Sequence, residues 1–444
     1  MTTLWFAQAL LATGWHRDVR IHLDGGRIAR IDTDVAPEPA ETRHATALPG
    51  IPNVHSHAFQ RLMAGLAEAR SGPDHDDFWS WRDLMYRLVA AITPDDMAAI
   101  AAMAFVEMLE GGFTRVGEFQ YLHHQPDGRP YDDPAEMAVA LADAAARTGI
   151  ALTLLPVFYA HAGFGGQPPH DGQRRFVTDL DEYATVRAAS ERAVAALPDA
   201  IVGVAPHSLR AVTPRGLAVL ATLAPDAPIH IHIAEQVREV DDCVAWIGRR
   251  PVDWLLDHHA VDARWCLVHA THVTPDEVAR IARAGAVVGL CPITEANLGD
   301  GIFPARAFLD AGGRFGIGSD SNVRIDAAEE LRTLEYGQRL TMRQRTVLAE
   351  HGRSNGRVLF ETARDGGAAA IGGGGLGVGE RADIVALAPD PLGQDDRALD
   401  RWIFGNATID MVWSAGQPVV TNGRHRDRDA IARRFDTVAR RLVG

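Results

Sequence analysis

The chain has 444 residues, 47% of them hydrophobic and 23% charged, with a formal net charge of −14. This length predicts one large buried core and a smaller second core. The acidic balance argues against a nucleic-acid partner. The sequence has no run of 18 apolar residues, so we also expect no membrane partner. Three cysteines without metal-type spacing favour a reducing, cytoplasmic location.

All 44 basic residues are arginine, and the chain contains no lysine. A chain without lysine can form neither a lysine Schiff base nor a carboxylated-lysine bridge between two metal ions. Both kinds of chemistry are therefore excluded. Any anionic substrate must be bound by arginine side chains instead.

Taken in chain order, residues 4–45 show alternating strands broken by turns. The run Leu4–Leu11 lacks a basic flank and a cleavage site, and is typical of a strand rather than a signal peptide. Short apolar runs then alternate with segments of helical period, the pattern of a parallel sheet with crossover helices. The pattern of alternating strands broken by turns returns at residues 376–424, after the glycine run Gly372–Gly375.

Eight strands are predicted between these flanks, and helices are predicted between the strands. The strands are Ala47–His55, Phe113–Phe119, Ala151–Tyr159, Ile201–His207, Pro228–Ala234, Cys266–Thr271, Ala286–Pro292 and Arg314–Asp320. The helices are Pro94–Gly111, Pro134–Thr148, Glu182–Leu197, Pro214–Leu223, Val237–His258, Pro275–Ala284, Phe303–Ala311 and Ala327–Leu348.

This element order predicts an α/β fold, a TIM (β/α)8 barrel with a small β-sandwich domain built from both chain termini. We expect residues 1–47 and 372–444 to form the small domain, the latter with a terminal helix, and residues 48–371 to form the catalytic barrel. Catalytic residues of such barrels lie at the carboxyl ends of the strands.

Four candidate metal ligands follow the predicted strands in order. His55 and His57 share one face of a strand because alternate residues do, and His232 and Asp320 end later strands. Three imidazoles and one carboxylate suit a single Zn²⁺ that keeps a water position. We expect His230 to point away from His232 and to pack against helices.

Three further roles follow from the chemistry of a zinc-activated water. Glu235 lies three residues after His232, where it can accept the water proton and pass it to a leaving nitrogen. His269 could orient the water or stabilise charge, and Asp320 can hydrogen-bond the same water. The predicted catalytic residues are therefore Glu235, His269 and Asp320, acting in the loss of ammonia.

The chain resembles the amidohydrolase superfamily, and within it the formimidoylglutamate deiminases of histidine degradation. The resemblance rests on motifs along almost the whole chain, namely Pro49–His57, Ala58–Arg61, Ala205–Val212, His232–Glu235, Ser319–Asn322 and Gly377–Val385. It implies zinc-dependent hydrolysis of N-formimidoyl-L-glutamate to N-formyl-L-glutamate and ammonia, by a homodimer with one zinc per chain.

Five substrate-binding residues are also implied. Arg210, after the fourth strand, offers a planar two-pronged donor to a carboxylate. The resemblance implies that Arg210 and His207 bind a carboxylate of the anionic substrate and that Gln60 contacts its formimino end. Arg82 and Tyr121 would complete the pocket. The tryptophans beside Arg82 fit either a lid or a buried aromatic anchor.

Two alternatives stay open on the sequence alone. One is a deaminase of the same superfamily acting on a heteroaromatic amine such as a purine, pterin or nucleoside, which needs no arginine aimed at a carboxylate. The other is a catalytically silent barrel with a structural or regulatory role. The presence of Glu235, His269 and Asp320 counts against the second.

Overall fold

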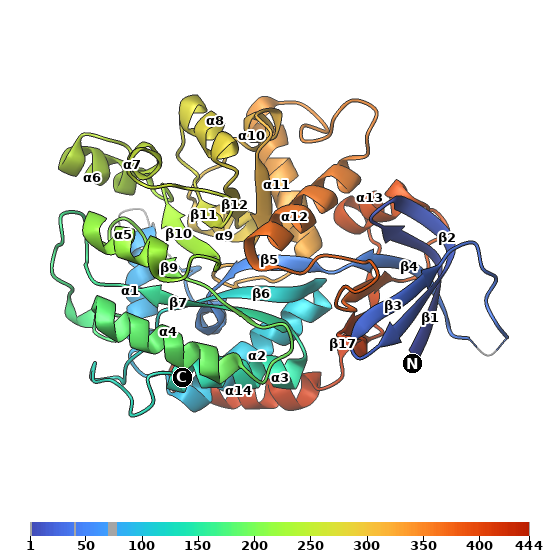
Figure 1. Ribbon diagram of the computed structural model, residues 1–444, viewed down its shortest axis with the longest axis horizontal. Coiled ribbons are helices and arrows are strands. Elements are labelled where there is room, and N and C mark those ends of the chain that lie inside the picture. Colours follow the sequence, from blue (N-terminus) through green and yellow to red (C-terminus); the bar gives the residue numbers. More distant parts are fainter. Residues whose placement is uncertain (1, 40, 70–77, 444) are drawn as a thin grey trace.

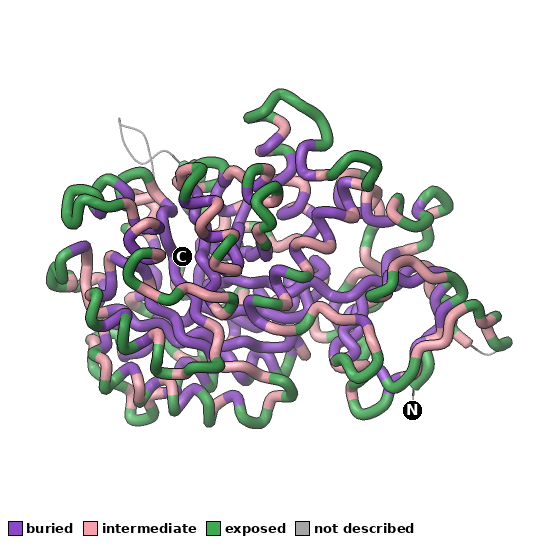
Figure 2. Tube along the Cα trace, turned by 45° about the horizontal axis from the view of Figure 1, so that its top comes forward, coloured by how far each residue is buried: buried purple, intermediate pink, exposed green. Residues whose placement is uncertain are grey.

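The computed structural model describes residues 2–39, 41–69 and 78–443, and its strands form two separate sheets (Figure 1). One sheet is a parallel barrel in the middle of the chain, and the other is built from strands near both termini. The barrel strands are buried along nearly their whole length, and exposed residues concentrate on the outer sides of helices and in loops (Figure 2). The predicted fold class is confirmed.

Strands of the barrel follow one another in hydrogen-bonded order around the ring. They are β5 (Ile51–Ser56), β6 (Phe113–Gln120), β7 (Ala151–Phe158), β8 (Ile201–Val202), β9 (Ala205–Pro206), β10 (Ile229–Ile233), β11 (Trp265–His269), β12 (Val287–Leu290) and β13 (Arg314–Ile317). Both β8 and β9 pair with β7, and so occupy one position of the ring. Parallel bridges from Val204 to Ile229 and from Ser208 to His232 close it.

The first barrel strand begins later than the sequence predicts. Residues through Pro49 belong to β4 (Arg43–Pro49) of the terminal sheet, so β5 starts at Ile51. The pairing of β5 with β6 also shifts register between Asn53 and Ser56, which adds one residue to β5. Bulges of this kind redirect side chains near active sites.

Helices cover the outside of the barrel and link its strands. They are α1 (Phe78–Val89), α2 (Pro94–Glu110), α3 (Glu136–Thr148), α4 (Leu180–Val194), α5 (Pro214–Leu223), α6 (Val237–Ile247), α7 (Pro251–His258), α8 (Pro275–Ala284), α9 (Pro292–Leu298), α10 (Ala305–Asp310), α11 (Ala327–Met342) and α12 (Asn355–Ile371). The short 3₁₀ helices η1 (Ala58–Met63) and η2 (Asp171–Gln173) lie in loops. Thr93 and Thr274 begin α2 and α8 with capping boxes, each followed by a proline at the first helical position.

Two predicted helices differ from the structure. The predicted helix Val237–His258 is two helices, because Gly248 adopts a left-handed conformation and Pro251 starts a new helix. The predicted helix Ala327–Leu348 ends at Met342, where Arg343 takes a left-handed conformation. Four further helices, α1, α9, α12 and α13 (Asp396–Phe404), are not among those predicted from the sequence.

Helix α12 closes the amino-terminal end of the barrel. A Cβ atom on Gly366 would lie 1.9 Å from the carbonyl oxygen of Phe315 in β13, so the two backbones are in direct contact. The end of α12, at Ala370, packs with Val54 and Val268 in an apolar cluster. This cluster fills the barrel beneath the polar layer described below.

The terminal sheet contains eight strands in the order β17-β16-β15-β14-β4-β1-β2-β3. The remaining strands are β1 (Thr2–Leu11), β2 (Gly14–Asp24), β3 (Arg27–Asp32), β14 (Ile384–Leu387), β15 (Ile409–Ser414), β16 (Gln417–Thr421) and β17 (Arg424–His425). The sheet folds back on itself, because Ile28 and Gly26 exchange backbone hydrogen bonds with Glu380 and Ala382. Its two halves enclose a second core that includes Phe6. Helix α13 (Asp396–Phe404) lies between β14 and β15, and α14 (Arg428–Val443) packs on α2.

The structure also bears on membrane-spanning helices and on the state of the three cysteines. No helix among the described residues is long and apolar enough to cross a membrane. Cys243, Cys266 and Cys291 are free thiols and all three are buried. The division of the chain at residues 47 and 371 stays a prediction.

Candidate metal centre and active-site pocket

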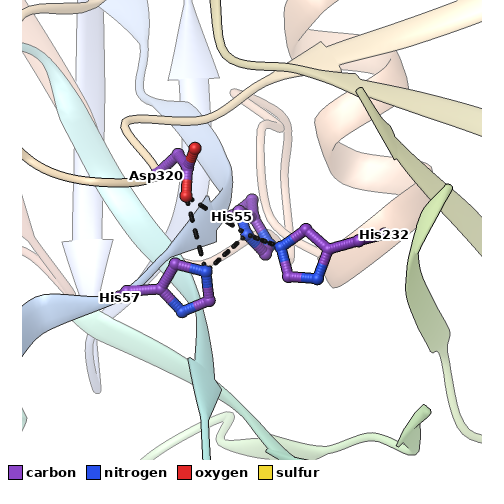
Figure 3. A group of neighbouring side chains, drawn as sticks. All are labelled: His55, His57, His232 and Asp320. Carbon is purple, nitrogen blue, oxygen red and sulfur yellow. Dashed lines mark hydrogen bonds and ion pairs between the residues drawn. The ribbon is translucent and has the colours of Figure 1, made fainter. Parts of the chain in front are cut away.

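Four buried side chains meet at the carboxyl ends of the barrel strands (Figure 3). His55 lies in β5 and His57 follows it, His232 lies in β10, and Asp320 follows β13. One possible ligand atom from each residue lies within 4.8 Å of all the others. The predicted ligand set is therefore brought together in space.

The spacing of these atoms fits a single ion. The Nε2 atom of His55 lies 3.1 Å from that of His57 and 3.0 Å from that of His232. The Oδ1 atom of Asp320 lies 3.6 Å and 3.4 Å from the Nε2 atoms of His55 and His57. Zinc–nitrogen bonds of about 2.05 Å in a tetrahedron place ligand atoms roughly 3.3 Å apart.

Hydrogen bonds to the backbone orient two of the imidazoles. The Nδ1 atom of His57 lies 3.0 Å from the carbonyl oxygen of Phe119, and that of His232 lies 3.0 Å from the carbonyl oxygen of His207. A proton on each Nδ1 atom leaves the Nε2 lone pair facing the shared centre. Burial lowers the pKa of His57 to about 3, so this imidazole is neutral. Neutral imidazoles are the form that binds metal.

The aspartate is held by an amide and hydroxyl network. Asn322 donates through Nδ2 to the carbonyl oxygens of His57 and Asp320, at 2.9 and 3.0 Å. Ser319 donates to Asn322, and Asn53 donates to Ser319. This network links the turn after β13, which carries Asp320, to β5, which carries His55. Asp320 itself has φ of 43°, a strained conformation for a residue other than glycine.

The predicted acid–base residues lie beside the metal group. His269 places its Nε2 atom 3.9 Å from Glu235 and 3.8 Å from Asp320. Its Nδ1 atom lies 3.2 Å from Oε1 of Glu295. Burial lowers the pKa of His269, but these three carboxylates outweigh burial and raise it to about 10. His269 is therefore a cation held among carboxylates in the metal-free protein.

Two buried glutamates in this region were missed by the sequence analysis. Glu239 accepts hydrogen bonds from the backbone N–H groups of Ala234 and Glu235, both at 3.2 Å. Its carboxylate also lies 4.0 Å from Nε of Arg210. Glu295 orients His269 in the same way that carboxylates orient metal-bound histidines. Both lie on helices, and a glutamate in a helical sequence does not by itself indicate that its side chain is buried.

The prediction that His230 faces away from His232 is wrong. Residues two apart on a strand share a face, and His230 lies below His232 inside the barrel. Its Nε2 atom is 3.3 Å from the carbonyl oxygen of Ala370 in α12. His230 thus packs against a helix, as expected, but from the interior.

All five predicted substrate-binding residues line one pocket over the metal group. The empty space of this pocket, including the part open to solvent, is about 580 Å³, and its walls include His57, His232, Glu235, His269 and Asp320. The five residues are Gln60, Arg82, Tyr121, His207 and Arg210. Aromatic side chains make up much of the remaining wall. The roles assigned to these residues stay predictions.

Within the pocket, Gln60 and Tyr121 contact each other, and both Gln60 and Arg210 have a buried polar atom without a hydrogen-bond partner among the described residues. Gln60 donates to the hydroxyl of Tyr121 at 3.0 Å, which leaves the buried Oε1 atom of Gln60 without a hydrogen-bond partner among the described residues. Arg210 lies 3.9 Å from Glu235 and 4.0 Å from Glu239, beyond hydrogen-bond distance. Its Nε atom is buried and also lacks a hydrogen-bond partner in the described part of the chain.

A closed βα barrel with three histidines and an aspartate at its carboxyl end is the arrangement of a metal-dependent hydrolase. The model of the amidohydrolase family matches residues 46–419, and that of the formimidoylglutamate deiminase HutF N-terminal domain matches residues 1–45. The chain belongs to the amidohydrolase family.

Two relatives and two solved structures are similar to this chain. Formimidoylglutamate deiminase of Pseudomonas aeruginosa is 51% identical over the whole of both chains. The 8-oxoguanine deaminase of the same organism is 28% identical, covering 79% of this chain and 76% of that one. The crystal structure of an amidohydrolase from Brucella melitensis has 51% identity and a TM-score of 0.97, with complete coverage of both chains. A zinc-bound adenosine deaminase from Xanthomonas campestris has a TM-score of 0.81 at 23% identity, covers 99% and 98% of the two chains, and supports the fold alone.

Proposed function

We propose that the chain hydrolyses N-formimidoyl-L-glutamate to N-formyl-L-glutamate and ammonia, with one zinc ion per chain. The observation that carries this proposal is Arg210, a buried guanidinium at the wall of the metal pocket with no carboxylate at hydrogen-bond distance in the described structure. Arg210 has Glu235 and Glu239 as charged neighbours at 3.9 and 4.0 Å, and an anionic substrate supplies the hydrogen-bond acceptor that its Nε atom lacks. The relative from Pseudomonas aeruginosa supports the same substrate.

Different residues of the protein are assigned to metal binding, proton transfer and substrate binding. Zinc, when bound by His55, His57, His232 and Asp320, supplies a hydroxide nucleophile at neutral pH. Glu235 takes one proton of the attacking water and gives it to the terminal formimino nitrogen, and the hydroxyl proton of the resulting tetrahedral adduct follows by the same route, so that this nitrogen leaves as ammonia. The C–N bond to that nitrogen breaks as the new C–O bond becomes the formyl carbonyl.

Binding is assigned to other residues of the same pocket. Arg210 and His207 hold a substrate carboxylate, and Gln60 contacts the formimino end through its unpartnered Oε1 atom. Arg82 and Tyr121 complete the wall. Because the carboxylate and the formimino group are anchored separately, the reacting carbon is held over the metal group.

Substitution of Arg210 tests the substrate directly. Arg210→Met should lower kcat/KM for N-formimidoyl-L-glutamate by roughly 30-fold or more, since loss of a buried charged pair costs about 2–5 kcal/mol. Zinc content should stay the same. On an analogue with amides in place of the carboxylates, wild type should react slowly and the variant should lose little more. Equal losses on both compounds would contradict the proposal.

The heteroaromatic alternative has its own signature. The relationship to 8-oxoguanine deaminase at 28% identity is the observation that favours it. An ammonia-release screen should find turnover of the formimino acid and none of purines, pterins or nucleosides. Release only from a heteroaromatic amine would establish the alternative, and release from no compound would favour a silent barrel.

Zinc, the oligomer and the cell compartment complete the proposal. The group of His55, His57, His232 and Asp320, in a chain with no lysine to bridge a second ion, predicts about one zinc per chain by elemental analysis, and activity that follows a second ion would contradict it. The homodimer is proposed from the family resemblance and is testable by light scattering. The cytoplasmic location is proposed from the three free cysteines.

A further inference from the structure

A second pocket adjoins the active-site pocket and shares two arginines with it. Arg82 and Arg210 line both pockets. The second pocket has a volume of about 1020 Å³, and its wall also contains Arg238 from α6. We call it the outer arginine pocket, defined by Arg82, Arg210, Arg238, Trp79, Phe164 and Trp246.

The three arginines surround one indole ring. The guanidinium carbon of Arg82 lies 4.4 Å from the ring centre of Trp79, that of Arg238 lies 4.7 Å away, and that of Arg210 lies 6.0 Å away. These distances are within the range of cation–π attraction. The indole therefore helps to hold three like charges close together, an arrangement that becomes favourable when an anion joins them.

The lining of the outer arginine pocket holds more positive than negative side chains. Asp242 is its single acidic lining residue among those described, and it lies 3.6 Å from Arg238. Glu235 and Glu239, which are not part of this lining, lie 3.9 and 4.0 Å from Arg210 and offset part of its charge. Within the lining, three arginines still exceed one aspartate by two charges, whereas the whole chain carries −14. A local excess of positive charge on an acidic protein attracts anions to that place.

The arginines form a path of decreasing exposure toward the metal group. The side chain of Arg238 is 66% exposed and that of Arg210 only 11%. The buried Nε atoms of Arg82 and Arg210 both lack a hydrogen-bond partner in the described structure. An anion that first meets Arg238 can thus exchange to donors that lie deeper and closer to the catalytic residues.

We propose that the outer arginine pocket is a binding site that captures a dicarboxylate substrate before it enters the metal pocket. This inference rests on the proposed function for the nature of the substrate. Arg238 and Trp79 form the outer part of the site, and Arg82 and Arg210 pass the anion inward. Arginine suits this task because its planar fork both stacks on an indole and binds a carboxylate.

Steady-state kinetics of Arg238→Met test the proposal. At about 0.01 M ionic strength, kcat/KM for N-formimidoyl-L-glutamate should fall by about threefold to tenfold, the effect expected when one steering charge is lost. The value of kcat should stay within about twofold of wild type. At about 0.5 M salt, where the screening length is about 4 Å, the difference should disappear. Arg238→Glu should show a larger loss with the same salt response.

The matched control is Arg306→Met. Arg306 is also on a helix and paired with an aspartate four residues later, but it lines neither pocket. It should behave as wild type at every salt concentration. Titration calorimetry with glutarate, a dicarboxylate that cannot react, should show weaker binding to Arg238→Met and unchanged binding to Arg306→Met.

Two results would overturn the inference. One is a loss in Arg238→Met no greater than in Arg306→Met, and the other is a loss that persists unchanged at high salt. In either case, turnover of the formimino acid by wild type would leave the proposed function intact. Failure of wild type to release ammonia from that compound would instead contradict the proposed function itself.

Discussion

The two ends of the barrel interior differ in composition: the carboxyl end buries polar and charged side chains, and the amino end buries apolar ones. At the carboxyl end, imidazoles and carboxylates are buried together, and Ala234, His269 and Asp320 all have positive φ. At the amino end, Val54 and Val268 pack against α12 with glycine backbones in contact. The carboxyl end holds unsatisfied charge for binding and catalysis, and the amino end supplies packing. Substitutions at the two ends should therefore affect different measurements.

The largest effect is expected for Glu235→Gln at the carboxyl end. Removal of a positioned acid–base group should lower kcat by roughly 10²–10⁴, or about 2.7–5.5 kcal/mol. The thermal midpoint and the zinc content should change little, since Glu235 is outside the ligand group. Loss of zinc together with the carboxylate would show that Glu235 is a ligand instead.

Gly366→Ala at the amino end should give the converse result. The new Cβ atom would lie 1.9 Å from the carbonyl oxygen of Phe315, so α12 must move away from β13. We expect the free energy of unfolding to fall by about 3 kcal/mol, with kcat of the folded fraction within twofold of wild type. Urea unfolding and active-site titration measure the two quantities.

A second glycine gives the control for that experiment. Gly337 in α11 has only ordinary contacts for a Cβ atom, at 3.6 Å from Ile302. Gly337→Ala should raise stability by about 0.5–1 kcal/mol, because alanine loses less entropy in a helix. A similar loss in both variants would mean that helix composition, rather than contact with the barrel, sets the effect.

A smaller effect on catalysis is expected for Glu239→Gln. Glutamine keeps one acceptor oxygen but turns an amide group toward a backbone N–H, so one of the bonds to Ala234 and Glu235 is lost. We expect kcat to fall by roughly 10–100-fold and KM not to rise, since loss of the negative charge beside Arg210 leaves more of its positive charge for the anionic substrate. Asp241→Asn, an exposed substitution on the same helix, should change neither quantity.

The smallest effect concerns zinc binding and pH. Burial and the neighbouring carboxylates raise the pKa of Asp320 to about 7 in the metal-free protein, although His269 lowers it. Zinc requires the carboxylate form, so protons compete below that pKa. Between pH 7 and pH 6 the carboxylate fraction drops from one half to about one eleventh, so zinc affinity should fall by about fivefold, while His57 stays neutral. A competing chelator measures this, and constant affinity over that interval would contradict the raised pKa.

Much of this architecture follows from the sequence, and the exceptions have physical reasons. All eight barrel strands were predicted because strands buried on both faces are continuous apolar runs. The four candidate ligands could be singled out because each lies at or just after the end of such a run. Helix α12 was missed because its alanine- and glycine-rich second half has no apolar periodicity, and its glycines are needed for contact with the barrel.

The remaining gaps concern relations between distant segments. The extra residue in β5 depends on its pairing with β6, which no local pattern records. The burial of Glu239 and Glu295 depends on which helix face meets the barrel, and a glutamate on a helix usually faces solvent. The match of Arg238 with Trp79 joins residues 159 positions apart, and only the folded chain brings them together.

The strands of the terminal sheet are synthesised at different times, so the sheet cannot form all its pairings at once. Strand β4 pairs with β1 on one side and with β14 on the other, and a single residue, Gly50, separates it from the first barrel strand. While the ribosome is still translating the barrel, the β14 side of β4 has no partner, because residues 384–387 have not been made. An exposed strand edge of this kind invites pairing with other chains. The β14 edge of β4 therefore stays unpaired until residues 384–387 have emerged, so this sheet closes only after the whole barrel has been synthesised.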